Sequence, residues 1–204
     1  MSSLILDLLF TPICLGCKKL GDHVCRDCLN RLKIVNRHDL AGIEDLICAS
    51  DYLGWLRDQV VAYKSGEYQN AIGLAQVLIS KCLSELPGYS LVPIPSSPEK
   101  IKNRGIDTIG HITQKIQNLL PSVSVSPVLK LTKNLPDQVG LTKAQRIKNL
   151  QAAFTCTKTL TKPVILVDDV VTTGATLTSA AQTLLKCGAP KVYAVGLCAT
   201  EKLS

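Results

Sequence analysis

The fold of this chain is decided by one stretch of its sequence, Val164-Ile165-Leu166-Val167-Asp168-Asp169-Val170-Val171-Thr172-Thr173-Gly174-Ala175-Thr176-Leu177. Four uninterrupted apolar residues predict a strand that is buried on both faces of a parallel sheet. Two adjacent carboxylates follow at the end of this strand, where open α/β sheets bind their ligands. Residues 172–176 then lead into a helix, and Gly174 allows the backbone to approach a ligand closely. Backbone N–H groups, hydroxyls and the helix dipole are together able to surround a phosphate.

A carboxylate pair beside a phosphate cradle suits a sugar phosphate, with the acids on the ribose hydroxyls. The stretch resembles the signature of the type I phosphoribosyltransferases, which is four apolar residues, two acids, two further residues and T-T-G-x-T. The resemblance implies phosphoribosyl pyrophosphate (PRPP) as the ligand, with Asp168 and Asp169 on the 2′- and 3′-hydroxyls. It assigns the 5′-phosphate to Val170, Val171, Thr172, Thr173, Gly174, Ala175 and Thr176. The structural alternative is an ordinary strand–turn–helix with an exposed acidic pair.

Strand and helix patterns alternate on both sides of this stretch. Strands are predicted at 46–50, 91–95, 164–167 and 192–197, and helices at 55–64, 70–86, 106–120 and 177–187. The alternation predicts an α/β fold with a mostly parallel sheet flanked by helices. The prolines near residue 95 predict a stiff loop after the second strand. We expect residues 46–204 to form the phosphoribosyltransferase-like domain and residues 1–45 to form an N-terminal helix and a small metal-binding module.

The N-terminal module is defined by two cysteine pairs, Cys14-x2-Cys17 and Cys25-x2-Cys28, which are seven residues apart. Two such pairs complete a tetrahedral four-thiolate site, which is typical of structural Zn²⁺. The alternatives are four unrelated thiols or two disulfides, and His23 is a weaker candidate ligand. The remaining five cysteines stand in apolar segments and are interpreted as small core residues; they are Cys48, Cys82, Cys156, Cys187 and Cys198.

The apolar residues 1–13 predict a helix that packs on the protein or on a partner. They have no basic region before the apolar stretch and no small-x-small cleavage site, so a signal peptide is not expected. No run in the sequence reaches the roughly 18–20 apolar residues of a membrane span. We therefore expect a cytoplasmic protein.

The net charge of +7 is concentrated in one part of the chain. Residues 99–148 contain nine basic and three acidic residues, a surplus of +6, whereas residues 1–50 are neutral. Because 46% of the residues are hydrophobic and 19% charged, a disordered basic tail is excluded. The surplus favours a phosphate ligand or a nucleic acid, although a solvated face has the same pattern. Because the segment with the cysteine pairs has no net charge, it is a less suitable DNA-binding surface than residues 99–148.

Three further groups of residues extend the resemblance over nearly the whole chain. They are Tyr52-Leu53-Gly54-x-x-Arg57 with Lys64-Ser65-Gly66, then Val92-Pro93-Ile94-Pro95 with Pro98, Lys100 and Arg104-Gly105, and last Gln138-x-x-Leu141 with Arg146, Asn149 and Ala153-Phe154. Together with the cysteine pairs they resemble the ComF (ComFC/GntX) family, a zinc knuckle joined to a phosphoribosyltransferase-like domain and linked to natural competence. The chain departs from the family at Ser97, where His is usual, and at Ile106-Asp107-Thr108, where Phe-Asn-Gln is usual. These departures bear on affinity for pyrophosphate and for the second substrate.

The resemblance implies transfer of a phosphoribosyl group from Mg²⁺-bound PRPP to a nitrogen acceptor. Lys64, Lys100 and Arg104 are the candidates for stabilising the charge of the leaving pyrophosphate. The basic segment around Gln138 and Arg146 is expected to close over the site as a lid, or to be a surface linker.

The alternative function is a non-catalytic protein that binds single-stranded DNA or a competence helicase, with the fold as a scaffold. A regulatory protein that senses PRPP is a third hypothesis. Tyr63 and Trp55 are able to stack a nucleobase, but packing in the core is the favoured interpretation of both.

Overall fold

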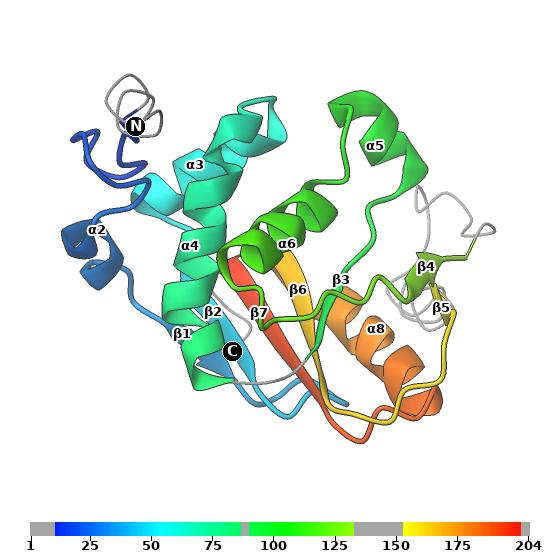
Figure 1. The fold of residues 1–204 in the computed structure, drawn as a ribbon. Coiled ribbons are helices and arrows are strands. Elements are labelled where there is room, and N and C mark those ends of the chain that lie inside the picture. Colours follow the sequence, from blue (N-terminus) through cyan, green and yellow to red (C-terminus); the bar gives the residue numbers. More distant parts are fainter. Residues whose placement is uncertain (1–10, 87–89, 133–152, 201–204) are drawn as a thin grey trace.

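The computed structural model describes residues 11–86, 90–132 and 153–200 (Figure 1). At its centre is a five-stranded sheet in the order β1-β2-β7-β6-β3. Among the described residues, β1 pairs antiparallel with β2, and the pairs β2–β7, β7–β6 and β6–β3 are parallel. The predicted α/β fold with a mostly parallel sheet is therefore confirmed. The strands are β1 (Val35–Arg37), β2 (Leu46–Asp51), β3 (Ser90–Pro93), β6 (Val164–Val171) and β7 (Val192–Ala199).

Helices cover both faces of this sheet. The helices α3 (Gly54–Lys64), α4 (Ala71–Lys81) and α6 (Thr108–Leu119) pack on one face, and α8 (Ala175–Lys186) packs on the other (Figure 1). Successive residues of a strand point to opposite faces, so Ile165 and Val167 enter the core under α4 and α6, whereas Leu166 faces α8. Because both faces are buried, the start of β6 is apolar at every position.

Several elements differ from the sequence-based expectation. The helix predicted at 70–86 is divided into η1 (Tyr68–Asn70), α4 and η2 (Leu83–Glu85). The 3₁₀ turn η2 aligns residues three apart, and it thereby brings Leu83 and Leu86 into the same core. The strand β6 continues four residues beyond the predicted end at Val167, because Val170 and Val171 also pair with β7.

The loop expected after β3 contains a short helix, α5 (Pro98–Arg104). The Ser97 side chain caps it by accepting a hydrogen bond from the Lys100 N–H at 3.3 Å, and Pro98 stands in its first turn. Gly105 ends it with a φ of 80°. These are ordinary helix boundary signals, and they were overlooked in the sequence. The helix predicted from residue 106 accordingly begins at Thr108.

A second, two-stranded antiparallel sheet was not predicted. It consists of β4 (Leu129–Leu131) and β5 (Phe154–Cys156). Both strands pack at the edge of the core formed with α8. Their short length leaves little periodic signal in the sequence.

The cysteine-containing segment packs on α4 and includes the short helix α2 (Arg26–Asn30). A Cβ on Gly73 of α4 would lie 2.5 Å from the Leu15 side chain, so the two segments are in close contact. The predicted domain boundary between residues 45 and 46 stays a prediction. The strand β1 lies before this boundary and pairs with β2 after it.

Two sequence predictions lie outside the described residues. They are most of the helix at 1–13, and the lid residues Gln138 and Arg146. Within the described parts of the chain, no helix combines the length and apolar character that crossing a membrane requires.

Candidate functional site

The acidic pair lies near the carboxyl end of β6 and is already engaged in hydrogen bonds. The Asp169 N–H donates to Asp168 Oδ1 at 2.8 Å, and the Val170 N–H donates to Asp169 Oδ1 at 2.7 Å. Lys64, the last residue of α3, places its Nζ 2.7 Å from Asp169 Oδ1. The side chains of this ion pair are 25% and 14% exposed, so the pair is partly shielded from water. Two residues 105 positions apart in the sequence are thus joined at one point.

The carboxyl group of Asp168 has a raised pKa. The pKa of Asp168 is raised to about 7, chiefly by burial and next by the negative charge of Asp169. A hydrogen bond from the Asp169 backbone and the positive charges of Lys64 and Lys100 act in the opposite direction. Perturbed carboxyls of this kind occur at functional sites, and also in structural ion-pair networks. Asp168 therefore changes its charge near neutral pH.

The loop after β6 has the backbone geometry of a tight turn into a helix. Gly174 has a φ of +76° and is the N-cap of α8. A Cβ at this position would lie 2.6 Å from Leu40 Cδ2 and 2.7 Å from Leu40 Cδ1, so glycine is required by conformation and by space. The Ala175 N–H donates to Thr173 Oγ1 at 3.3 Å. The loop therefore presents the amino end of α8, which favours an anion.

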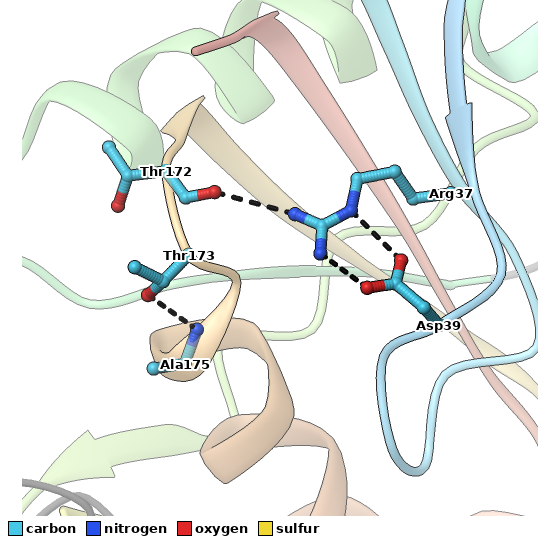
Figure 2. A network of polar contacts seen from close by, with 5 residues as sticks. All are labelled: Arg37, Asp39, Thr172, Thr173 and Ala175. Atoms are coloured by element: carbon cyan, nitrogen blue, oxygen red, sulfur yellow. Dashed lines mark hydrogen bonds and ion pairs between the residues drawn. The ribbon is translucent and has the colours of Figure 1, made fainter. Parts of the chain in front are cut away.

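A polar network from the N-terminal part of the chain supports this loop (Figure 2). Arg37, the last residue of β1, donates from Nε and Nη2 to the two carboxylate oxygens of Asp39, at 2.9 and 2.7 Å. Its Nη1 donates to the Thr172 carbonyl oxygen at 3.4 Å. The Arg37 side chain is 17% exposed. The fork of Arg37 is thus oriented by Asp39, and it holds the backbone at the start of the loop.

Sequence reasoning did not identify Arg37, Asp39 or Leu40 as part of the site. They belong to the expected N-terminal module, and Arg37 lies 135 residues before Thr172. Neither a motif nor a charge cluster marks these three positions. Their role follows from the hairpin of β1 with β2, which places residues 37–40 against the amino end of α8.

The cations predicted to bind pyrophosphate occupy different positions. Lys64 contacts Asp169, and Lys100 on α5 is near enough to Asp168 to lower its pKa. Arg104 is held through its backbone, because the Tyr68 hydroxyl donates to the Arg104 carbonyl oxygen. The structure therefore brings Lys64 and Lys100 to the acidic pair, and it ties the backbone of Arg104 to Tyr68, the first residue of η1.

The residues that depart from the family pattern have structural roles. Ser97 is the N-cap of α5, and Asp107 is the N-cap residue of α6. The Ser96 hydroxyl donates to Asp107 Oδ1 at 2.9 Å, which links the two ends of the α5 segment. These contacts account for the fold of the segment.

The aromatic residues Tyr63 and Trp55 lie in the core on the α3 side of the sheet. Tyr63 is 1% exposed, and its hydroxyl donates to the Thr108 carbonyl oxygen at 3.1 Å and lies 2.9 Å from His111 Nδ1. Trp55 packs against the same core, and a Cβ on Gly16 would lie 3.2 Å from its ring. Both residues therefore have the packing role that was favoured over base stacking.

The four cysteines of the two pairs form one cluster. The sulfur atoms of Cys14, Cys17, Cys25 and Cys28 lie within 4.8 Å of one another, a group that could hold a metal ion. Burial raises the pKa of Cys14, but hydrogen bonds from the backbone of Cys17, Cys25 and Gly16 outweigh it and bring the pKa to about 6. Four sulfur donors at this spacing suit Zn²⁺, which is the metal of structural four-cysteine sites.

The other five cysteines do not share one environment. Cys48, Cys82 and Cys198 are fully buried, as predicted, and burial raises the pKa of Cys48 and Cys198 to about 12. Cys156 and Cys187 are only partly buried, so their interpretation as core residues was wrong. Cys156 ends β5 and Cys187 follows α8, which places both at the margin of the core.

Comparison with known proteins identifies two relatives. The chain is 30% identical over 167 residues to DNA utilization protein YhgH of Salmonella typhi, and the match covers 76% of this chain and 72% of that protein. It is 29% identical over 112 residues to Competence protein F of Haemophilus influenzae, covering 53% of this chain and 49% of that protein. The chain thus spans about half the length of the Haemophilus protein. No family model matches the chain.

Proposed function

Because this chain belongs to the ComF family, we propose that it acts in the uptake or use of DNA, and that the loop after β6 binds PRPP. The first part follows from the names of the two relatives, which refer to competence and DNA utilization. The second part depends on the site itself. The observation that carries it is the left-handed Gly174 at the start of α8, next to an acidic pair on β6.

Each part of PRPP has a complementary group in this arrangement. The amino end of α8 suits the 5′-phosphate, because its N–H groups and helix dipole favour an anion. Asp168 and Asp169 suit the ribose hydroxyls, since carboxylates accept hydrogen bonds from them. Lys64 and Lys100 interact electrostatically with the acidic pair. Their positive charges suit the negative charge of a Mg²⁺-bound pyrophosphate group. The chemistry that follows is displacement of pyrophosphate at C1′ by a nitrogen nucleophile.

The ion pair between Lys64 and Asp169 has a consequence for this proposal. Lys64 and the Val170 N–H both contact Asp169 Oδ1, and the second carboxylate oxygen is able to accept from a ribose hydroxyl. The Lys64 ammonium is then shared between this carboxylate and the pyrophosphate, because both are anionic. PRPP binding should for this reason depend on Lys64 as well as on the two acids.

Isothermal titration calorimetry with PRPP and Mg²⁺ tests the proposal. The wild-type protein should bind PRPP, and Asp168→Asn combined with Asp169→Asn should abolish binding while the circular dichroism spectrum stays unchanged. Asp58→Asn is a matched control, because Asp58 is an exposed acid paired with Arg57 on α3. Unaltered binding by the double variant would exclude the site, and release of pyrophosphate in the presence of candidate bases would identify catalysis.

Binding of single-stranded DNA is a second candidate, and the surface of α5 favours it. Lys100 and Lys102 are exposed on this helix, and Arg104 is partly exposed at its end. Contacts with phosphates release counterions, so affinity should fall steeply as salt rises. Lys102→Gln should weaken binding to oligonucleotides and leave PRPP binding unchanged, because Lys102 has no described contact with the acidic pair. Salt-independent binding of oligonucleotides would exclude this candidate.

The four-cysteine cluster is proposed to be a structural zinc site. Four thiolates leave no open coordination position, so the metal is expected to stabilise the knuckle rather than to take part in chemistry. The contact of Leu15 with Gly73 would then transmit this stabilisation to α4. Elemental analysis should find about one zinc per chain, and a protein without zinc would exclude the assignment.

A further inference from the structure

Two of the nine cysteines are used neither by the metal-binding cluster nor by the core. Four form the cluster, and Cys48, Cys82 and Cys198 are fully buried. The remaining two, Cys156 and Cys187, are partly exposed. They are 31 residues apart in the sequence, but they lie on elements that pack together, β5 and α8.

Backbone contacts hold the segments of these two cysteines against each other. The Leu160 N–H donates to the Cys187 carbonyl oxygen at 2.8 Å, so the chain after β5 crosses the carboxyl end of α8. Gly188 packs closely against the same segment, because a Cβ there would be 2.5 Å from the Leu160 carbonyl oxygen. The two segments are therefore in contact at Leu160, Cys187 and Gly188.

The thiols of Cys156 and Cys187 line the same surface cavity. This cavity has a volume of about 490 Å³, and its other lining residues include Lys158 and Lys186. The Cys156 thiol donates a hydrogen bond to the Lys158 carbonyl oxygen at 3.1 Å. Burial raises the pKa of Cys187, and a hydrogen bond with the Cys156 side chain raises it further. The two cysteines thus stand on packed elements and line one cavity, which brings both side chains to the same solvent-accessible place.

We propose that Cys156 and Cys187 are a redox-active pair that closes into a disulfide when the protein meets hydrogen peroxide. In the first step, the Cys156 thiolate attacks one peroxide oxygen, so that an S–O bond forms and the O–O bond breaks. The departing hydroxide takes up a proton, and Cys156 becomes a sulfenic acid. In the second step, the Cys187 sulfur attacks the Cys156 sulfur, the S–S bond forms, and the S–O bond breaks with loss of water. Two thiols and one peroxide thereby give one disulfide and two waters.

The disulfide would close a loop around the elements that carry the proposed phosphate site. Residues 156–187 contain β6, the acidic pair, the loop at 172–176 and all of α8. A cross-link between the two ends of this unit restricts the unfolded chain. We expect the oxidised protein to have a melting temperature higher by roughly 5 °C or more.

Peptide mapping of the zinc-loaded 204-residue chain tests the proposal. After treatment with one equivalent of hydrogen peroxide, a non-reducing tryptic digest should contain peptide 149–158 linked to peptide 187–191, about 2 Da lighter than their sum. Cys156→Ser and Cys187→Ser should each remove the cross-linked species and the rise in melting temperature. Dithiothreitol should reverse both effects in the wild type. Zinc content before and after oxidation shows whether the four-cysteine cluster has stayed intact.

Three outcomes would overturn the proposal. The two thiols could remain reduced until zinc has been lost, which would make the cluster the first target of the peroxide. Each thiol could be oxidised separately to a sulfinic acid without a cross-link. Either thiol could pair with a cysteine elsewhere in the chain. None of these outcomes bears on PRPP binding, which is measured independently.

Discussion

The proposed phosphate loop is most sensitive at Gly174, where both the backbone conformation and the surrounding space require glycine. With a φ of +76°, alanine at this position costs about 1–2 kcal/mol in backbone energy. Its Cβ would lie 2.6 and 2.7 Å from the two methyl groups of Leu40, and such overpacking costs about 1–3 kcal/mol. We therefore expect Gly174→Ala to lower the free energy of unfolding by about 2–5 kcal/mol.

Gly105→Ala is the matched control for this variant. Gly105 has a nearly equal φ of +80°, but no atom lies within 4 Å of the position of its Cβ. Only the backbone cost of about 1–2 kcal/mol is expected there. Urea unfolding followed by far-ultraviolet circular dichroism measures both variants. Equal losses at Gly174 and Gly105 would refute the contact with Leu40 as a source of instability.

A double-mutant cycle tests the contact directly. Leu40→Ala alone should cost about 2–5 kcal/mol, because Leu40 is buried and a cavity remains. The same change removes the methyl groups that a Cβ introduced by Gly174→Ala would meet. The loss in Leu40→Ala combined with Gly174→Ala should therefore be smaller than the sum of the two single losses. Additive losses would contradict the predicted contact.

Three other perturbations have defined outcomes. Arg37→Gln should weaken PRPP binding about tenfold in calorimetry, because the Thr172 carbonyl oxygen loses its hydrogen-bond donor. The control Lys191→Gln removes a surface ion pair with Glu44 and should leave PRPP binding unchanged. Asp168→Asn should raise the melting temperature at pH 8 and change it little at pH 4. The pKa of Asp168 in the folded protein is raised to about 7, so ionisation of this buried acid lowers the stability of the folded state as pH rises from about 4 to 7. The lost free energy of unfolding is on the order of a few kcal/mol. A lower melting temperature of this variant at pH 8 would contradict the argument. Cys14→Ser should release zinc, which elemental analysis measures. It should also accelerate amide hydrogen exchange in residues 14–32 more than in β6. Equal acceleration in both regions would count against a local zinc module.

The central part of the fold was predictable because its signals are local. The apolar run at 164–167 predicts a doubly buried strand, and the acids, threonines and glycine after it predict the turn into α8. The two cysteine pairs predict their own cluster, since each pair is a turn and the two turns are close in sequence. The boundaries of α5 were also encoded locally, in Ser97, Pro98 and Gly105, although they were overlooked.

The partners of the site residues were not predictable in this way. The sequence around Lys64 is the same whether its side chain binds pyrophosphate or Asp169. The packing of α3 on the sheet places its Nζ 2.7 Å from Asp169 Oδ1. Cys156 and Cys48 both stand in strands, but β5 lies at the margin of the core and β2 lies within it. The exposure of each thiol thus depends on where its strand lies in the fold.

Local sequence signals were sufficient to predict an α/β protein with an acidic pair, a glycine-containing loop after it and four cysteines spaced for one metal. Each of these features depends on residues within about one secondary structure element, where backbone geometry limits the alternatives. Packing of distant segments sets the contacts of Arg37 and Leu40 with the loop, the ion pair of Lys64 with Asp169, and the cavity that Cys156 and Cys187 share. Those contacts join residues between 31 and 135 positions apart, so they depend on how the elements pack and not on any local pattern.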